Sequence, residues 1–189
     1  MSKVAIQGNA SGTGTFTIAA PNSNSNQTLT LPDQTGTVIT TAGVPKSALP
    51  SGSVLQVVNA TYSTQLVTTS TSYVDTGLSA SITPTSATSK ILICVQQTGL
   101  GKLAGDGNQR IALNILRNST QLTQFEIGAA YTGSSVNNVV GGSGTNYLDS
   151  PATTSSVTYK TQVKGFGTSN VYVNYDSCTS TITLMEIAA

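Results

Sequence analysis

Residues 90–97, KILICVQQ, form the clearest strand pattern in the chain and point to its fold class. Side chains of a strand alternate between its two faces, so Ile91, Ile93 and Val95 share one face and Leu92 and Cys94 lie on the other. Both faces are largely apolar, which is typical of a central strand covered on both sides. The stretch predicts the middle of a sheet whose neighbouring strands come from the rest of the chain.

Similar alternation recurs throughout residues 53–189. Ile111, Leu113 and Ile115 alternate with more polar neighbours, and Ile182 alternates with Thr183 in the same way. The predicted strands are 54–59, 65–68, 73–76, 78–83, 90–97, 110–117, 121–127, 156–164, 171–175 and 181–187. Short strands at this spacing predict an antiparallel β-sandwich of jelly-roll type.

Two long stretches interrupt this pattern, residues 98–109 and 128–154. An ordered loop of the second length is usually functional, or else contains short strands, of which 136–140 is a candidate. Tyr131 and Tyr147 flank its glycine-rich centre. Exposed Tyr among Ser, Gly and Asn is typical of adaptable binding loops, so these two are the predicted contacts with an outside partner. The alternative hypothesis is that these tyrosines contact a neighbouring subunit.

The chain carries unusually little charge, which affects how its sheet edges are protected. Charged residues make up 8% of the sequence, against about 25% in an average soluble domain. Soluble sheet proteins commonly guard their edge strands with charged side chains. We therefore expect the edges to be covered by other copies of the chain, in a homotrimer. A net charge of +1 predicts neither nucleic-acid binding nor attraction to an acidic membrane surface.

Residues 14–41, GTFTIAAPNSNSNQTLTLPDQTGTVITT, differ from the rest. Three short strands are predicted there, at 15–19, 28–31 and 37–41. So few apolar residues give only a marginal sheet, so the segment needs a partner. We expect residues 1–41 to dock to another protein through the apolar side chains Phe16, Ile18, Leu29 and Leu31. Residues 42–52, rich in Pro and Gly, form a linker to a carried domain at 53–189.

The N-terminal motifs also show a family resemblance. Gly8 to Ile18, GNASGTGTFTI, followed by an Asn-rich loop, Thr28 to Asp33 and Thr35 to Val38, resembles the N-terminal part of tail-fibre-like proteins of tailed bacteriophages, marine or cyanophage-like ones in particular. The resemblance covers about a tenth of the chain in motif terms. It implies a virion structural protein, attached to the particle by this end and usually trimeric.

The sequence offers little material for catalysis. There is no His, which removes the commonest general base and the commonest metal ligand. Asp106 and Asp149 are the only carboxylates in long loops that could face one cleft, and we expect them to be turn residues. Asp106-Gly107-Asn108 lacks the remaining ligands of a calcium loop. We expect no catalytic, cofactor or metal site.

The cationic and cysteine residues suggest structural roles. Lys90, Lys102, Arg110, Arg117, Lys160 and Lys164 are scattered without aromatic residues between them, unlike a nucleic-acid patch. Cys94 and Cys178 lack the spacing of a metal or redox pair, which favours two small apolar residues in a core and leaves a disulfide open. The N-terminus has no signal-peptide pattern, so we expect synthesis in a host cytoplasm and no membrane insertion.

These features predict a non-enzymatic virion protein. Its expected form is a short tail fibre that binds polysaccharide or protein on the host surface. A capsid decoration, cement or head-fibre protein is the alternative, and a small polysaccharide-cleaving spike is a second one.

Overall fold

The computed structural model describes residues 11–15, 17, 22, 24–26, 28, 44, 46 and 49–189. The chain divides into two units, residues 1–39 and residues 40–189, and each is considered by itself. The predicted docking residues Phe16, Ile18, Leu29 and Leu31 lie outside the described residues. The predicted boundaries of the docking segment and linker therefore stay predictions.

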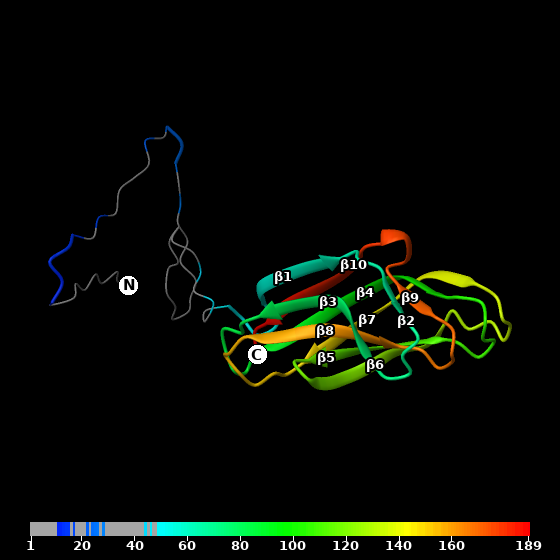
Figure 1. The fold of residues 1–189 in the computed structure, drawn as a ribbon. Helices are drawn as coiled ribbons and strands as arrows, with labels where there is room; N and C mark the ends of the chain where they lie inside the picture. Colours follow the sequence, from blue (N-terminus) through cyan, green and yellow to red (C-terminus); the bar gives the residue numbers. More distant parts are fainter. Residues whose placement is uncertain are drawn as a thin grey trace. The chain divides into compact units, whose positions relative to one another are not determined.

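From residue 49 onward the described chain is built from strands, as predicted (Figure 1). They are β1 (Val54–Tyr62), β2 (Leu66–Thr68), β3 (Val74–Ile82), β4 (Lys90–Lys102), β5 (Ile111–Arg117), β6 (Thr120–Ala129), β7 (Asn138–Asp149), β8 (Val157–Lys164), β9 (Val171–Val173) and β10 (Ser180–Ile187). A short 3-10 helix, η2 (Tyr175–Ser177), separates β9 from β10. The predicted strands at 73–76 and 78–83 form one strand, β3, with a register shift between Asp75 and Ser79.

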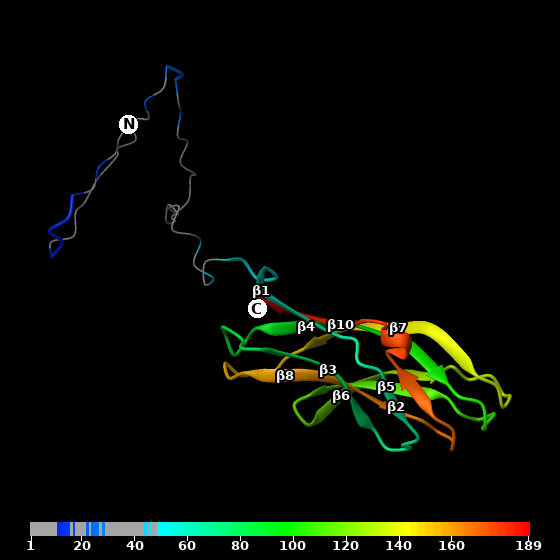
Figure 2. The same ribbon diagram turned by 45° about the horizontal axis from the view of Figure 1, so that its top comes forward.

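The strands form two antiparallel sheets that face one another (Figure 2). Sheet A has the order β1-β10-β4-β7, and the short strands β9 and β2 extend it beside β4. Sheet B has the order β3-β8-β5-β6. The first long strand thus lies beside the last, and this alternation of early and late strands in both sheets is the jelly-roll arrangement. The predicted all-β sandwich is confirmed.

The predicted loop over 98–109 begins only at residue 103, because strand β4 continues through Gly99 to Lys102. The odd-numbered residues of 91–97 are buried, whereas beyond Gly99 the buried residues include Leu100 and Lys102. Gly99 has a φ of 58°, which is unfavourable for a residue with a Cβ. The alternation of side chains therefore changes phase, although the strand itself continues to Lys102.

Residues 138–149 of the predicted loop over 128–154 form strand β7, which includes part of the candidate strand at 136–140. It pairs with β4 from Ile91 to Lys102 and contains three glycines, at 141, 142 and 144. A Cβ at Gly142 would lie 2.5 Å from the carbonyl oxygen of Gln97 on β4. The glycine content that predicted a loop instead permits a close approach between two strands.

Two apolar clusters fill the space between the sheets. The larger contains Leu78, Ala80, Ile82, Ile91, Ile93, Val95, Ile115, Val157, Tyr159, Ile182 and Leu184. The second contains Leu100, Ile111, Leu113, Ala130, Val163, Val171 and Val173. Burial of each large apolar side chain contributes about 1.5–3 kcal/mol to folding, so these clusters supply most of the favourable free energy.

A layer of buried polar side chains separates the two clusters. Gln97 on β4 donates from Nε2 to Ser180 Oγ on β10 (2.7 Å) and to Asn174 Oδ1 (3.3 Å). Its Oε1 accepts a hydrogen bond from Thr161 Oγ1 on β8 (2.8 Å), which is in turn bonded to Thr76 Oγ1 on β3 (2.5 Å). All five residues are buried. This network joins sheet A to sheet B through directional bonds.

The outer face of sheet A carries an apolar row. Val57, Met185, Leu92 and Leu148 stand side by side across β1, β10, β4 and β7. Val57 and Leu148 are 57% and 50% exposed, and Leu92 is half-buried. Within the described part of the chain only the face of β4 toward sheet B is buried, so cover of its outer face stays a prediction.

The two cysteines do not share a core. Both are free thiols, Cys94 half-buried on the outer face of β4 and Cys178 exposed after η2. The predicted core position is wrong for Cys178, because the turn that follows η2 faces solvent.

We expect Gln97→Leu to lower the free energy of unfolding by about 2–3 kcal/mol, because buried hydroxyl and amide groups lose a partner. The neighbouring Gln96 is exposed on the opposite face of β4, so Gln96→Leu should change it by less than about 0.5 kcal/mol. Chemical denaturation of both variants measures the difference. Equal effects would show that the network adds nothing to stability.

Candidate functional site: the loop end of the sandwich

Four connections meet at one end of the sandwich, which we call the loop end. They are residues 69–73, 103–110, 130–137 and 165–170. Gly165 N donates to Ser70 O (2.8 Å), which joins the first connection to the fourth. Ala104 N donates to Asn137 Oδ1 (2.7 Å), which joins the second to the third. The opposite end contains the start of β1, where Ala188 N donates to Ser53 O (2.9 Å) (Figure 2).

A buried lysine fixes two of these connections. Lys102 is fully buried, and its Nζ donates to the carbonyl oxygens of Asp106 (3.2 Å) and Ser134 (2.9 Å). A buried ammonium group needs hydrogen-bond acceptors, so its two carbonyl partners hold residues 103–110 and 130–137 together.

A buried glutamine and an aspartate fix the fourth connection, residues 165–170. Gln109 Oε1 accepts hydrogen bonds from the backbone amides of Phe166 (2.7 Å) and Gly167 (2.8 Å), and Nε2 donates to Ser169 O. Asp106 Oδ2 accepts one from Thr168 N (2.9 Å). Hydrogen bonds from the amides of Thr168 and Asn108 hold the pKa of Asp106 below its usual value. Residues 165–170 are thus tied to residues 103–110 by side chains.

A row of alternating cations and aromatic rings crosses the outer face of sheet B at this end. The Arg110 guanidinium carbon lies 4.0 Å from the centre of the Phe166 ring. Lys164 Nζ lies 4.9 Å from the same centre and 4.9 Å from the centre of the Tyr73 ring. Tyr73 in turn donates from its hydroxyl to Gln124 Oε1 on β6 (2.8 Å). Both cations are attracted by the negative ring faces.

A hollow of about 280 Å³ adjoins this row, and Arg110 is part of both. The other lining residues are Ile127, Gly128 and Tyr131. Ile127 and Tyr131 are 57% and 52% exposed. The carboxyl group of Glu126 lies next to the hollow, where Oε1 accepts a hydrogen bond from Ile127 N (2.9 Å). The site therefore offers an aromatic face, an apolar side chain, two cations and a carboxylate.

The two predicted contact tyrosines occupy different environments. Tyr131 lies in the connection 130–137 at the loop end and lines the hollow. Tyr147 lies on β7, half-buried, and packs against the larger apolar cluster. The structure thus does not bring the two together, and contact of either one with a partner stays a prediction.

The prediction that the cations lack interleaved aromatic residues is wrong for Arg110 and Lys164. Phe166 and Tyr73 lie against them in space, although Tyr73 and Arg110 are far from Lys164 in sequence. The only available signal was local: Lys164 and Phe166 flank a glycine, and Arg110 follows a loop.

Asp106 and Asp149 do not form a catalytic pair. Asp149 pairs with Ile91 at one end of β4, and Asp106 contacts Lys102 at the other end, about 35 Å away at ~3.3 Å per residue. Such a separation far exceeds the spacing of the carboxyl pair in glycoside hydrolases.

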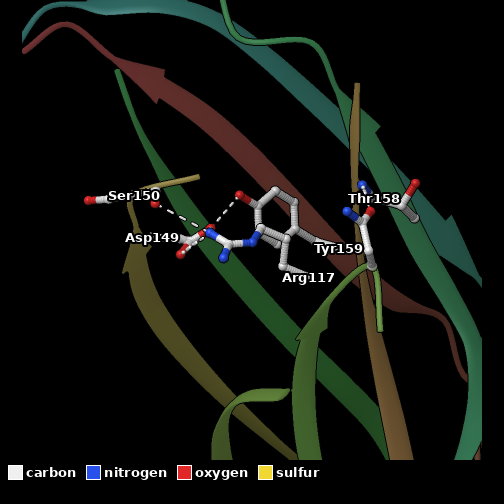
Figure 3. A network of polar contacts seen from close by, with 6 residues as sticks. Arg117, Asp149, Ser150, Thr158 and Tyr159 are labelled. Atoms are coloured by element: carbon white, nitrogen blue, oxygen red, sulfur yellow. Dashed lines mark hydrogen bonds and ion pairs between the residues drawn. The ribbon is translucent and has the colours of Figure 1, made fainter. Parts of the chain in front are cut away.

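Asp149 is not a turn residue: it ends strand β7, and its buried carboxylate forms an ion pair with the half-buried Arg117 (Figure 3). Its carboxylate accepts hydrogen bonds from Arg117 Nη1 (2.9 and 3.0 Å) and from the Tyr159 hydroxyl (2.7 Å). Burial, followed by the hydrogen bond to Asp149, raises the pKa of Tyr159. Arg117 also donates to Ser150 O (3.3 Å). The arrangement ties β5, β7 and β8 together.

A larger hollow of about 490 Å³ lies at the opposite end of the sandwich. Its lining is Lys46, Leu49, Leu55, Thr85, Ser86, Thr88, Ser89, Ala188 and Ala189. Lys46 is the one charged side chain in this lining, and the hydroxyl residues around it form no arrangement with recognisable chemistry.

No group of three or more His, Cys, Asp or Glu side chains among the described residues is arranged to hold a metal ion. No helix in the described part of the chain has the length and apolar character required to span a membrane.

No protein-family model matches the chain, and no curated protein matches its sequence. Among solved structures, the chain is similar to VP2 of infectious bursal disease virus in its subviral particle. The TM-score is 0.42 at 11% identity, over 72% of this chain and 34% of that one. T=1 particles derived from the same virus give a TM-score of 0.39 at 12% identity, over 72% and 37% of the two chains. The chain spans about a third of those proteins, and the likeness concerns strand arrangement alone.

We expect Gln109→Leu to free the backbone amides of Phe166 and Gly167, which lose their acceptor. Hydrogen exchange at these amides should accelerate at least about tenfold, which corresponds to the loss of one hydrogen bond of ~1.4 kcal/mol. Exchange measured by mass spectrometry on this variant and on Gln96→Leu tests this. Unchanged exchange at 165–170 would contradict the role assigned to Gln109.

Proposed function

We propose that the chain is a non-enzymatic virion structural protein of a tailed bacteriophage, made in the host cytoplasm. In this proposal, residues 1–41 attach it to the particle and the jelly roll at 53–189 faces outward. The observation that carries the proposal is that the two ends of the sandwich differ. The chain leads into β1 at one end, and the four joined connections lie at the other. The resemblance of residues 8–38 to phage tail-fibre-like proteins agrees with it.

Adsorption to the host surface is the role that we favour, as in a short tail fibre. The loop end carries a fixed set of cationic and aromatic side chains on its surface. Buried Gln109 and Lys102 hold the backbone of the connections that carry them. Exposed, well-fixed polar and aromatic groups on connecting segments are typical of binding surfaces. A polysaccharide or protein of the host surface is the proposed partner.

Capsid decoration, or cement, is the second candidate, and the outer face of sheet A favours it. The apolar row of Val57, Met185, Leu92 and Leu148 suits a permanent contact with another protein. The polysaccharide-cleaving spike loses support, because its only candidate carboxylates, Asp106 and Asp149, lie at opposite ends of β4.

A homotrimer is part of the proposal. β1 and β7 form the two edges of the long part of sheet A. β1 contains no charged residue, and β7 has none before Asp149 at its end. Edges without charged side chains are prone to pair with other chains, so neighbouring copies are the expected cover.

Removal of residues 1–41 should leave a folded, soluble oligomer that no longer joins phage particles, because the docking residues are lost. Quantitative mass spectrometry of purified particles, with labelled full-length and shortened chains, measures incorporation.

Full-length protein should also compete with phage for adsorption to host cells. Particles that lack the chain, adsorb normally and break on mild heating would favour cement instead, and a shortened chain that unfolds would contradict the division into two parts.

Leu148→Lys should dissociate the trimer, because it puts a charge into the apolar row at the β7 edge, while a surface change of this kind alters folding stability by only about 0.5 kcal/mol. Light scattering after size exclusion gives the mass. Val67→Lys on β2, which is similarly exposed at 44%, is the matched control and should remain trimeric. A trimer that survives Leu148→Lys would exclude this face as the interface, and a monomeric wild type would contradict the trimer itself.

A further inference from the structure

Two cations at the loop end lack an anionic partner. The ion pairs within the described residues are Arg117 with Asp149 and Lys160 with Asp75. Arg110 and Lys164 instead lie against the same ring, 4.0 and 4.9 Å from the centre of Phe166. Two like charges held this close repel each other, and the ring only partly offsets the repulsion. Both cations contact one ring, so an anionic group beside that ring would be attracted to both.

The position of this pair is fixed before any ligand arrives. Gln109 Oε1 accepts hydrogen bonds from the amides of Arg110 (3.2 Å), Phe166 (2.7 Å) and Gly167 (2.8 Å), and Gln109 is fully buried. One buried side chain therefore sets the backbone on both sides of the cation–ring contact. A preorganised site loses less conformational entropy on binding than a mobile one.

The adjoining hollow adds groups that suit a sugar ring. Tyr131 presents an exposed aromatic side chain, and the apolar C–H face of a pyranose packs well on such a ring. Ile127 forms another apolar wall, and Glu126 supplies an acceptor for hydroxyl groups beside it. Its volume of about 280 Å³ is adequate for a sugar ring.

We infer that the loop end binds an acidic sugar residue of a polysaccharide, through Arg110, Lys164 and Tyr131. The carboxylate of a uronic acid accepts hydrogen bonds from Arg110 and lies near enough to Lys164 to be attracted by it, and the ring of the same sugar stacks on Tyr131. The inference deepens the proposed adsorption role and rests on it for its biological meaning. Arg110 lines the hollow and is also one of the two cations. Both halves of the site therefore depend on it.

The same groups fit other anions less well. Nucleic acid requires several cations that follow the phosphate backbone, and this chain has a net charge of +1. An acidic peptide would use the two cations but leave the aromatic hollow without a function. A sugar with one carboxylate uses both parts.

The test is calorimetric titration of the full chain with a galacturonic-acid hexamer, with a neutral maltose-type hexamer as the uncharged comparison. We expect binding of the acidic hexamer only. Arg110→Met, Lys164→Met and Tyr131→Ala should each weaken it about tenfold or more, as expected for loss of a bond to a charged group or of a stacked ring. Lys90→Met and Tyr175→Ala, which remove a cation and an exposed aromatic ring elsewhere, should leave affinity unchanged.

Several outcomes would overturn the inference. They are no binding of the acidic hexamer at millimolar concentration, equal loss in the Lys90 and Tyr175 variants, or equally strong binding of dextran sulfate that Tyr131→Ala does not weaken. Stronger binding of a hexaglutamate peptide would assign the site to acidic peptides. If the chain binds no sugar but is present on particles and blocks adsorption, only this inference fails. If it binds the hexamer but is absent from particles, only the proposed function fails.

Discussion

The hydrogen bonds that cross the middle of the sandwich fix how the two sheets lie on each other. Apolar clusters on either side give most of the stability, but apolar packing has little directional preference. Gln97 accepts from Thr161 on the opposite sheet and donates to Ser180 on its own, so only one alignment satisfies all of these buried groups. Because β4 continues from Gln97 to Lys102, that alignment also sets where the loop end begins.

At the loop end, buried polar side chains hold the connections in addition to the second apolar cluster. Lys102 binds backbone carbonyls of two connections, and Gln109 binds backbone amides of a third. Each would be costly to bury without these partners. Their need for hydrogen bonds therefore holds long connections in place, and Arg110, Phe166 and Lys164 are presented on a rigid base. The same chemistry explains how a chain with few charged residues can maintain a defined polar surface.

The strands were largely predictable because burial on one face leaves a period of two in the sequence, as in Ile111, Leu113 and Ile115. The prediction failed where that period breaks. At Gly99 the alternation of side chains between the two faces of β4 changes phase. In β7 the glycines at 142 and 144 allow close contact with β4. Glycine in a sequence is compatible with a loop or with close packing, and only the neighbouring strand distinguishes the two.

The sequence by itself determined the fold class, the absence of histidine chemistry and the prominence of Tyr131 in a connection. The tertiary structure decided the site around that tyrosine. Tyr73, Arg110 and Lys164 come from three strand ends or connections that are distant along the chain, and pairing within sheet B brings them together. It also separated Asp106 from Asp149 by the length of β4. Such contacts depend on strand order within the sheets, which the side-chain pattern of a single strand does not specify.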